Sequence, residues 1–506
     1  MGVIAKQSIR GTVITYAGVF VGFLTTFFVL TRFLTAEEIG LARVLIDAAT
    51  LFIALAQLGT TTSIIRFYPY FNGQDTDEDE TDEHGFFFWT ILVPLLGFAL
   101  FTGLFCALHG PLSAYFGEKS ELFVKYYYMV LPLAFFMLYQ NVFETNAIVR
   151  MRIVFPRAVR ELFVRIGLLT VYLLYAFRYI DLDGFVISLC VVYALAMIAN
   201  IIYLFSIGRI SLRPDLGFLR SHPELVRQYL TYTLFLLLSS LATVLAPYLS
   251  SFILTARQGL SQTGIFAIAT YVAYMVSIPS RSVTSIASPQ LAAALKNNNR
   301  AELSTLTKQV SNNLFLIGVV ILLVIYINLD LFFHILPQGE VYAAGKKAVI
   351  LLMLAQLLIA TFSFSTITLN YSRHYYLSLI YSLLLTLGAI ALNNYFIPLW
   401  GLTGAGAASL LAYLAYYIII LCTIAITTHT TPLSVGMLKT VLLGSVVVGS
   451  NWLWSRFMPP LNIWWDAILR TIIFIIPLLV IACVWQISPD LNRELTRYLP
   501  RFKRHS

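Results

Sequence analysis

Apolar stretches of about 20 residues, separated by short polar breaks, recur along the whole chain. None shows the period-two alternation of a barrel strand, and in hydrocarbon a segment of this length satisfies its backbone hydrogen bonds by forming a helix. The pattern predicts an all-α, polytopic membrane protein. We expect fourteen transmembrane helices, at residues 11–33, 41–65, 86–108, 123–147, 162–179, 184–207, 229–254, 264–287, 311–329, 348–369, 377–397, 402–424, 439–457 and 465–485.

The placement of basic residues orients these helices. Most of the 33 Lys and Arg residues lie in the N-terminus, in the loops that follow even-numbered spans and in the C-terminus. Strongly basic segments occur at 150–160 and 493–504. Because cytoplasmic loops are enriched in Lys and Arg, both termini are predicted to be cytoplasmic. The first span lacks a small-residue cleavage site and is therefore interpreted as a retained helix.

One loop on the predicted cytoplasmic side, residues 72–85 (NGQDTDEDETDEHG), is strongly acidic. The orientation rule gives acidic residues little weight, so the predicted topology is unchanged. The loop is interpreted as a solvated segment, with a regulatory or divalent-cation contact as the alternative.

The composition gives little support for bound metals or cofactors. Cys106, Cys190, Cys422 and Cys483 lie inside apolar spans without a Cys-x-x-Cys pair, and the seven histidines are scattered. Neither a disulfide framework nor a metal centre is therefore expected, and no cofactor. The absence of a phosphate-binding Gly-Lys-Ser/Thr loop and of a nucleic-acid motif argues against ATP hydrolysis and nucleic-acid binding by this chain.

Three sequence landmarks near the ends of spans recur 220 to 224 positions later, in the same order. They are the pairs Gly40 and Gly264, Asn146 and Asn370, and Gly184 and Gly404. We interpret them as an internal repeat of six spans, although Gly and Asn also favour span ends in general. An even number of spans gives the two repeats the same orientation, related by an axis along the membrane normal.

The repeat predicts the organisation of the chain. The predicted parts are an N-terminal six-helix bundle (1–207), a cytoplasmic linker (208–228), a C-terminal six-helix bundle (229–424), two appended helices (425–485) and a basic cytoplasmic tail (486–506).

An arginine, Arg281, lies inside the predicted eighth span in the sequence YMVSIPSRSVTSIASP (274–289). Pro279 and Pro289 flank it together with several hydroxyl side chains, which predicts a kinked, polar and water-lined segment. A guanidinium in such a segment suits a phosphate, which it binds through two hydrogen bonds. The alternative is a side chain that extends about 9 Å to the cytoplasmic headgroups.

Further charges lie at the ends of the first two spans. Arg32 closes the first span, Arg43 opens the second with Asp47 one turn on, and Arg66 closes the second span on the inside. Arg43 and Asp47 are interpreted either as a self-neutralising structural pair or as an arginine oriented for a substrate phosphate. For Arg66 we favour extension to the interface over a role in a polar cavity.

The fourth and last spans also carry polar residues. Gln140 and Glu144 lie on one helical face with Asn141 near, and they predict either hydrogen bonds between helices or a surface for sugar hydroxyls. Glu144 as a protonatable switch is a further alternative. Asp466 and Arg470, one turn apart in the last span, are expected to form a structural pair.

Four segments carry a resemblance to a known family: TRFLTAEEIGLARVL (31–45), SIIRFYPYF (63–71), GIFAIATYVAYMVSIPSRS (264–282) and IPLWGLTGAGAAS (397–409). Over roughly residues 1–430 the chain resembles the polysaccharide transporters, or Wzx-type oligosaccharide flippases, of the multidrug/oligosaccharidyl-lipid/polysaccharide flippase superfamily. The resemblance implies a V-shaped pair of six-helix bundles around a central cavity in the bacterial inner membrane. It also implies alternating-access movement of a lipid-linked oligosaccharide.

The resemblance and the charged residues together predict a flippase for an undecaprenyl-pyrophosphate-linked oligosaccharide, moving it from the cytoplasmic to the periplasmic leaflet. Arg32, Arg43 and Arg281 are the candidates for binding the pyrophosphate in a cationic cavity. Expected partners are the lipid-linked oligosaccharide, membrane lipids and a polysaccharide polymerase, and we expect a monomer.

Two other functions were weighed against the flippase. A cation-coupled multidrug exporter of the same superfamily needs an embedded carboxylate. The first span has none, the seventh lacks the acid that many members carry, and Asp47 is the remaining candidate. A membrane glycosyltransferase or polymerase needs carboxylates or a metal beside the leaving pyrophosphate. The short predicted outer loops hold no acidic pair with a histidine, so no enzyme is expected.

Overall fold

The computed structural model describes residues 14–15, 17–71, 85–150, 152–207, 214–297, 299–372, 374–458 and 462–488. These ranges are helical and contain no strand, which confirms the predicted all-α class. Among them, eight helices are long and apolar enough to cross a membrane by length and composition. The chain is a multi-pass membrane protein, and the count of fourteen spans stays a prediction. The acidic segment 72–84 and the tail beyond 488 lie outside the described residues.

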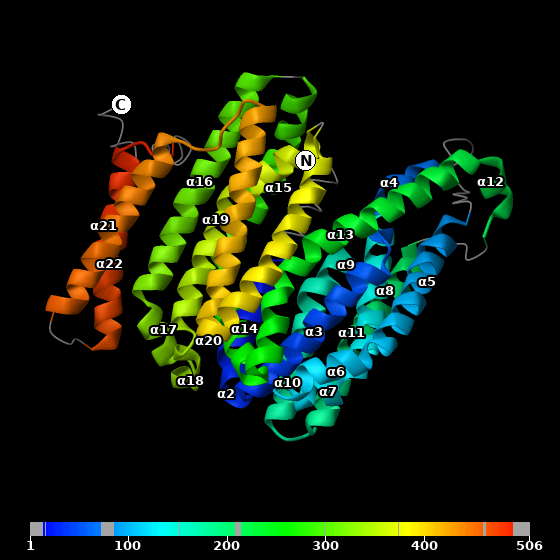
Figure 1. The fold of residues 1–506 in the computed structure, drawn as a ribbon, viewed down its shortest axis with the longest axis horizontal. Coiled ribbons are helices and arrows are strands. Elements are labelled where there is room, and N and C mark those ends of the chain that lie inside the picture. Colours follow the sequence, from blue (N-terminus) through cyan, green and yellow to red (C-terminus); the bar gives the residue numbers. More distant parts are fainter. Residues whose placement is uncertain are drawn as a thin grey trace. The chain divides into compact units, whose positions relative to one another are not determined.

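The chain forms two compact units, Met1–Ala267 and Ile268–Ser506 (Figure 1). This division lies inside the predicted eighth span. The sequence instead places a linker between the two bundles at 208–228. The predicted domain boundaries therefore stay a prediction. The helices that begin in the first unit are η1 (Thr25–Leu30), α2 (Thr31–Phe33), α3 (Ala36–Ala56), α4 (Thr60–Phe71), α5 (Phe86–Ala107), α6 (His109–Gly117), α7 (Glu121–Lys125), η2 (Tyr127–Met129), α8 (Val130–Val149), α9 (Val154–Ala158), η3 (Val159–Phe163), α10 (Val164–Ala176), α11 (Leu182–Ile207), α12 (Leu216–Ser221), α13 (Pro223–Gln258) and α14 (Leu260–Tyr274).

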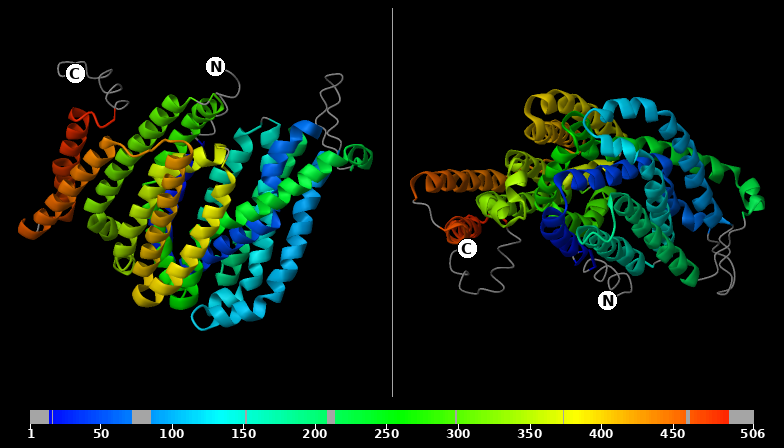
Figure 2. Two further views of the ribbon diagram at one scale, coloured as in Figure 1. Left: turned by 45° about the horizontal axis from the view of Figure 1, so that its top comes forward. Right: turned by 90° about the horizontal axis from the view of Figure 1, so that it is seen from below.

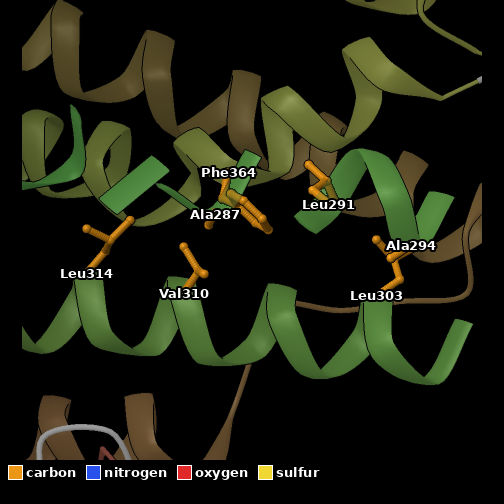
Figure 3. Packing of buried hydrophobic residues seen from close by; sticks show 7 residues of the cluster. All are labelled: Ala287, Leu291, Ala294, Leu303, Val310, Leu314 and Phe364. Atoms are coloured by element: carbon orange, nitrogen blue, oxygen red, sulfur yellow. The ribbon is translucent and has the colours of Figure 1, made fainter. Parts of the chain in front are cut away.

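In the described part of the second unit, eight further helices begin. They are α15 (Ile278–Lys296), α16 (Arg300–Ile327), α17 (Leu329–Ile335), α18 (Gly339–Ala343), α19 (Lys346–Tyr371), α20 (Tyr376–Thr427), α21 (Val435–Phe457) and α22 (Ile463–Val484). Alanine, leucine and valine side chains of α15 and α16 form one cluster of its core together with Phe364 of α19, as the close view in Figure 3 shows. Small residues on α15 let the aromatic ring of α19 pack between the helices.

The start of α3 is fixed by a capping box. The Thr35 hydroxyl accepts a hydrogen bond from the Glu38 amide, and the Glu38 carboxylate accepts one from the Thr35 amide at 2.8 Å. The two contacts satisfy amide groups that have no partner within the helix. They set the first turn of α3, and with it the position of Arg43 two turns later.

The predicted eighth span is broken between α14 and α15. Residues 275–277 form tight turns with hydrogen bonds three residues apart, such as Ser277 N–H to Tyr274 C=O at 3.0 Å. Pro279 explains the break, because its ring lacks an N–H and collides with the carbonyl four residues before it in a continuous helix. The predicted kink is confirmed, and it places Arg281 in the first turn of α15.

The predicted eleventh and twelfth spans appear as one long element, α20, with a bend at Gly401. Gly401 has φ 54° and ψ −126°, a conformation that other residues rarely adopt. Pro398 lies just before the bend, and a Cβ on Gly404 would lie 2.0 Å from the Phe396 carbonyl oxygen. The segment IPLWGLTGAG is therefore a helical hairpin whose glycines are required by its backbone geometry.

Helix boundaries support the internal repeat. Corresponding helices end or begin 220 to 222 positions apart, at Ala107 and Ile327, at His109 and Leu329, and at Val149 and Tyr371. Each repeat also carries two short helices in the same place, α6 and α7 in the first and α17 and α18 in the second. Helix positions that repeat at the offset of the sequence landmarks make a chance coincidence of Gly and Asn a poor explanation.

The landmark glycines Gly40 and Gly264 lie at one close crossing, between α3 and α14. A Cβ on Gly264 would lie 1.8 Å from the Ala36 carbonyl oxygen, and a Cβ on Gly40 would lie 2.0 Å from the Leu260 carbonyl oxygen. Ala36 and Leu260 are the first residues of the two helices and are themselves 224 positions apart. The contacts are thus reciprocal, as expected when equivalent segments meet about a two-fold axis.

The two appended helices, α21 and α22, form a hairpin beside α16, drawn orange to red in Figure 2. Two asparagines hold it. The Asn312 amide of α16 donates to the carbonyl of Ile487, which follows α22, at 2.6 Å. The amide of Asn328, the residue after α16, donates to the Thr471 hydroxyl of α22 at 2.8 Å. Inside the hairpin, Arg470 and Asp466 form an ion pair at 2.7 Å. The predicted structural pair is confirmed.

The glycine crossing gives a prediction about stability. Gly264→Ala places a methyl group against backbone and should destabilise the protein by about 1–3 kcal/mol, because the helices must move apart. Gly103→Ala in α5 is the matched control, since a Cβ there meets nothing within 4 Å. It should be neutral or stabilising by up to about 1 kcal/mol. Equal melting temperatures for the two purified variants would contradict the packing described here.

Candidate functional site

Arg43 and Asp47 form an ion pair on α3. The Arg43 Nε lies 2.8 Å from Asp47 Oδ2, and the two side chains are 15% and 4% exposed. Asp47 also interacts with the Ser251 hydroxyl of α13. The predicted contact is confirmed: a carboxylate held from two sides orients the guanidinium on α3. A role of this pair in substrate binding stays a prediction.

The other predicted phosphate-binding arginines have exposed side chains. The Arg32 guanidinium lies 5.5 Å from the centre of the Phe33 ring. Arg281 is exposed in the first turn of α15 and belongs to the second unit, whereas Arg32 and Arg43 belong to the first. Arg66, predicted to extend to the interface, is exposed in the middle of α4, and its guanidinium lies 5.6 Å from the centre of the Phe67 ring.

The polar residues of the fourth span lie on α8. Gln140 and Glu144 are buried and one turn apart, and Asn141 is half-buried. Glu144 makes an ion pair with Arg160 of η3, with 3.0 Å between Oε1 and Nη1. Glu144 Oε2 is buried and has no hydrogen-bond partner among the described residues. The carboxylate therefore joins two helices and retains an unsatisfied oxygen.

Glu144 belongs to a larger charge network that the sequence analysis missed. Glu161 contacts both Arg160, at 3.4 Å, and Arg165, at 3.1 Å. Arg165 also donates to the Gly18 carbonyl of the first span at 2.8 Å. In sequence, the basic segment 150–160 indicates the cytoplasmic side of the membrane but not which acids its arginines contact.

A second polar cluster lies where the outer ends of spans are predicted. The Lys125 ammonium group donates to Asp183 at 2.7 Å and to the Tyr126 hydroxyl at 3.0 Å. Tyr175 donates to Glu38 beside the capping box of α3. These contacts tie α3, α7, α10 and α11 together at one end.

In the described part of the chain, no three His, Cys, Asp or Glu side chains lie together as metal ligands. The polar groups are instead arginines, acids and amides on helices.

Comparison with protein-family models shows to which family the chain belongs. The family model described as polysaccharide biosynthesis protein matches residues 5–292, more than half of the chain. The protein belongs to this family. The match confirms the resemblance to polysaccharide transporters that the sequence shows, and the all-helical membrane fold agrees with it. None of the curated proteins matches the sequence.

Solved structures share the fold of this family member at low sequence identity. A structure described as the lipid II flippase MurJ in an inward closed conformation superimposes with a TM-score of 0.67 and 13% identity, covering 96% of this chain and 99% of that one. An inward-facing MATE-family multidrug transporter of the MOP superfamily gives a TM-score of 0.56 and 15% identity, covering 84% and 96% of the two chains. The Vibrio cholerae MATE transporter VcmN gives 0.56 and 13%, covering 83% and 98%. All three are described as flippases or transporters and none as an enzyme.

The Arg43–Asp47 pair gives a second prediction. Asp47→Leu leaves a largely buried guanidinium without its counter-charge and should cost about 3–5 kcal/mol, whereas the double variant Arg43→Met/Asp47→Leu should recover much of that loss. Melting temperatures of the purified full-length variants measure the difference. As a control, Asp330→Asn at the exposed Asp330–Lys346 pair should cost about 1 kcal/mol or less. If the effects of Arg43→Met alone and Asp47→Leu alone add up to the effect of the double variant, the two residues do not act as a pair.

Proposed function

We propose that this family member is a flippase that moves an undecaprenyl-pyrophosphate-linked oligosaccharide from the cytoplasmic to the periplasmic leaflet of the bacterial inner membrane by alternating access. The family match over residues 5–292 carries the proposal, because polysaccharide biosynthesis in a membrane requires that lipid-linked intermediates change leaflet. The fold shared with a protein described as a lipid II flippase supports it.

The pyrophosphate group of the substrate sets a requirement for the cavity. A pyrophosphate that leaves water needs cationic hydrogen-bond donors, and arginine provides a planar, permanently charged group for this. Arg32, Arg43 and Arg281 are proposed to bind the pyrophosphate along a cationic cavity, with Asp47 orienting Arg43 until a phosphate oxygen replaces it. Gln140, Asn141 and Glu144 are proposed to face sugar hydroxyls.

A cation-coupled multidrug exporter is the second candidate, favoured by the fold shared with MATE transporters. Such an exporter requires a carboxylate that is free to exchange protons or sodium. Asp47 is the acid of the second span, and it is already paired with Arg43. The pairing favours the flippase over the exporter.

The proposed role of Arg281 is tested in vesicles that contain the purified protein. Arg281→Ala should abolish the appearance of lipid-linked oligosaccharide in the outer leaflet, and Arg281→Lys should restore only part of it, because an ammonium cannot form the paired hydrogen bonds of a guanidinium. Both substitutions should preserve folding, since Arg281 is exposed. Arg227→Gln, at an exposed arginine of α13, is the control and should transport normally.

Two results would count against this assignment. Normal transport by Arg281→Ala would remove this residue from the substrate path. Drug efflux by the wild-type vesicles in a proton or sodium gradient, without movement of the oligosaccharide, would favour the exporter.

A further inference from the structure

A cluster of charged side chains joins α8 to the start of the predicted fifth span. We call it the α8–η3 cluster; its members are Glu144 of α8, Arg157 of α9, Arg160 and Glu161 of η3, and Arg165 of α10. Glu144 interacts electrostatically with Arg157 as well as with Arg160. The cluster holds three arginines and two acids, so it keeps a surplus positive charge.

Contacts with the first span hold the side chains of the α8–η3 cluster in place before a ligand binds. Arg165 donates to the Gly18 carbonyl at 2.8 Å, and a Cβ on Gly22 would lie 2.5 Å from its Nη1. Glycine at position 22 therefore leaves the space in which the guanidinium lies. Arg165 in turn holds Glu161 at 3.1 Å, and Glu161 contacts Arg160. A side chain that is fixed in this way loses little conformational freedom when it binds a ligand.

The backbone in this region is specialised. Arg160 and Glu161 belong to η3, a π-helical turn, and the first span contains a second π-helical segment, η1. Such turns are rare in proteins overall, and those that occur are often found at functional sites. A Cβ on Gly18 would lie 2.3 Å from the Glu161 carbonyl oxygen, so this turn lies directly against the first span.

Binding capacity remains on the two outer arginines. The Arg160 side chain is 45% exposed and uses Nη1 and Nε for the two acids, which leaves Nη2 without an acceptor among the described residues. Arg157 is half-buried, and its side chain makes no hydrogen bond or ion pair with another described residue. Residues three positions apart are neighbours on a helix surface. The unused donors therefore lie within reach of one anion.

An unsatisfied acceptor lies beside these donors. Glu144 is 4% exposed, and its Oε2 is buried without a hydrogen-bond partner among the described residues. Buried polar atoms normally form hydrogen bonds, so a donor from a bound ligand would satisfy this oxygen. A sugar hydroxyl next to a phosphate is such a donor, and a glycosyl pyrophosphate carries both groups.

We propose that Arg157 and Arg160 bind the pyrophosphate group of the lipid-linked substrate on its entry, with Glu144 accepting a hydrogen bond from the adjoining sugar. This site is separate from Arg32, Arg43 and Arg281, and it rests on the proposed function. By the predicted topology it lies on the cytoplasmic side, where the substrate is loaded. Because guanidinium groups bind phosphate oxygens in general, the headgroup of an anionic phospholipid is the competing source of the same chemistry.

Binding to the purified full-length protein tests the site. The probes are undecaprenyl pyrophosphate, inorganic pyrophosphate and phosphatidylglycerol, titrated against the wild type, Arg157→Gln, Arg160→Gln and the control Arg227→Gln. Loss of one charged hydrogen-bonding group should raise the Kd for the two pyrophosphates about tenfold in each site variant. The Kd for phosphatidylglycerol should be unchanged, and the control should bind every probe as the wild type does.

A folding defect must be separated from a binding defect. Arg160→Gln leaves the buried Glu144 without its counter-charge, so it is paired with the double variant Glu144→Gln/Arg160→Gln, in which two amides replace the ion pair. The double variant should melt near the wild-type temperature and still bind pyrophosphate about tenfold more weakly. Wild-type affinity for pyrophosphate in this folded variant would overturn the proposal.

The remaining outcomes are also decisive. A loss of phosphatidylglycerol binding alone would assign the arginines to the membrane surface and overturn the pyrophosphate site. Unchanged Kd values for all probes would do the same. Failure of the proposed function looks different, because wild-type vesicles would then move no lipid-linked oligosaccharide whatever the two arginines bind.

Discussion

Hydrocarbon offers no water to a peptide group or to a charge, so every polar atom that enters a bilayer needs a partner within the protein or a wet surface. This constraint explains the continuous helices of the described chain and the places where they break. The break at 275–277 is closed by short-range hydrogen bonds, and the bend at Gly401 uses a conformation that glycine adopts readily. The same constraint explains why Arg43, Arg165 and Arg470 lie against acids one turn away on the same helical face.

Close backbone approach is the second element of the structure. In a membrane, helices gain little from burying apolar side chains against each other, so contact depends on small residues that admit the neighbouring backbone. Gly40 and Gly264 do this reciprocally at the start of α3 and α14, and Gly18 and Gly22 do it for η3 and Arg165. The first pair relates the two repeats, and the second positions charged groups. Glycines in this chain thus serve symmetry in one place and electrostatics in another.

Features fixed by neighbours in sequence were predictable. Pro279 predicts the broken eighth span, and the spacing of four residues predicts the contact between Arg43 and Asp47. Contacts between segments that are distant in sequence were not predictable, because the sequence does not show which helices pack against each other. Arg160 meets Glu144 across sixteen positions, and Asn312 meets the Ile487 carbonyl across 175. Glu144 is visible in the sequence as a polar residue of the fourth span, but nothing in the basic segment 150–160 indicates that Arg160 is its partner.

The distribution of ion pairs separates two kinds of arginine. Arg165 and Arg470 have acids on their own helix and further acceptors on a neighbouring one, so their charge is satisfied by the fold. An arginine of that kind is structural, because binding an anion would require an existing contact to break. Arg157 and Arg281 are different: neither makes a side-chain hydrogen bond or ion pair with another described residue. An arginine without a direct ion pair, in a chain that must minimise such charges, is retained for a ligand or for the membrane surface, and the choice between these two depends on whether pyrophosphate or phospholipid binds it more tightly.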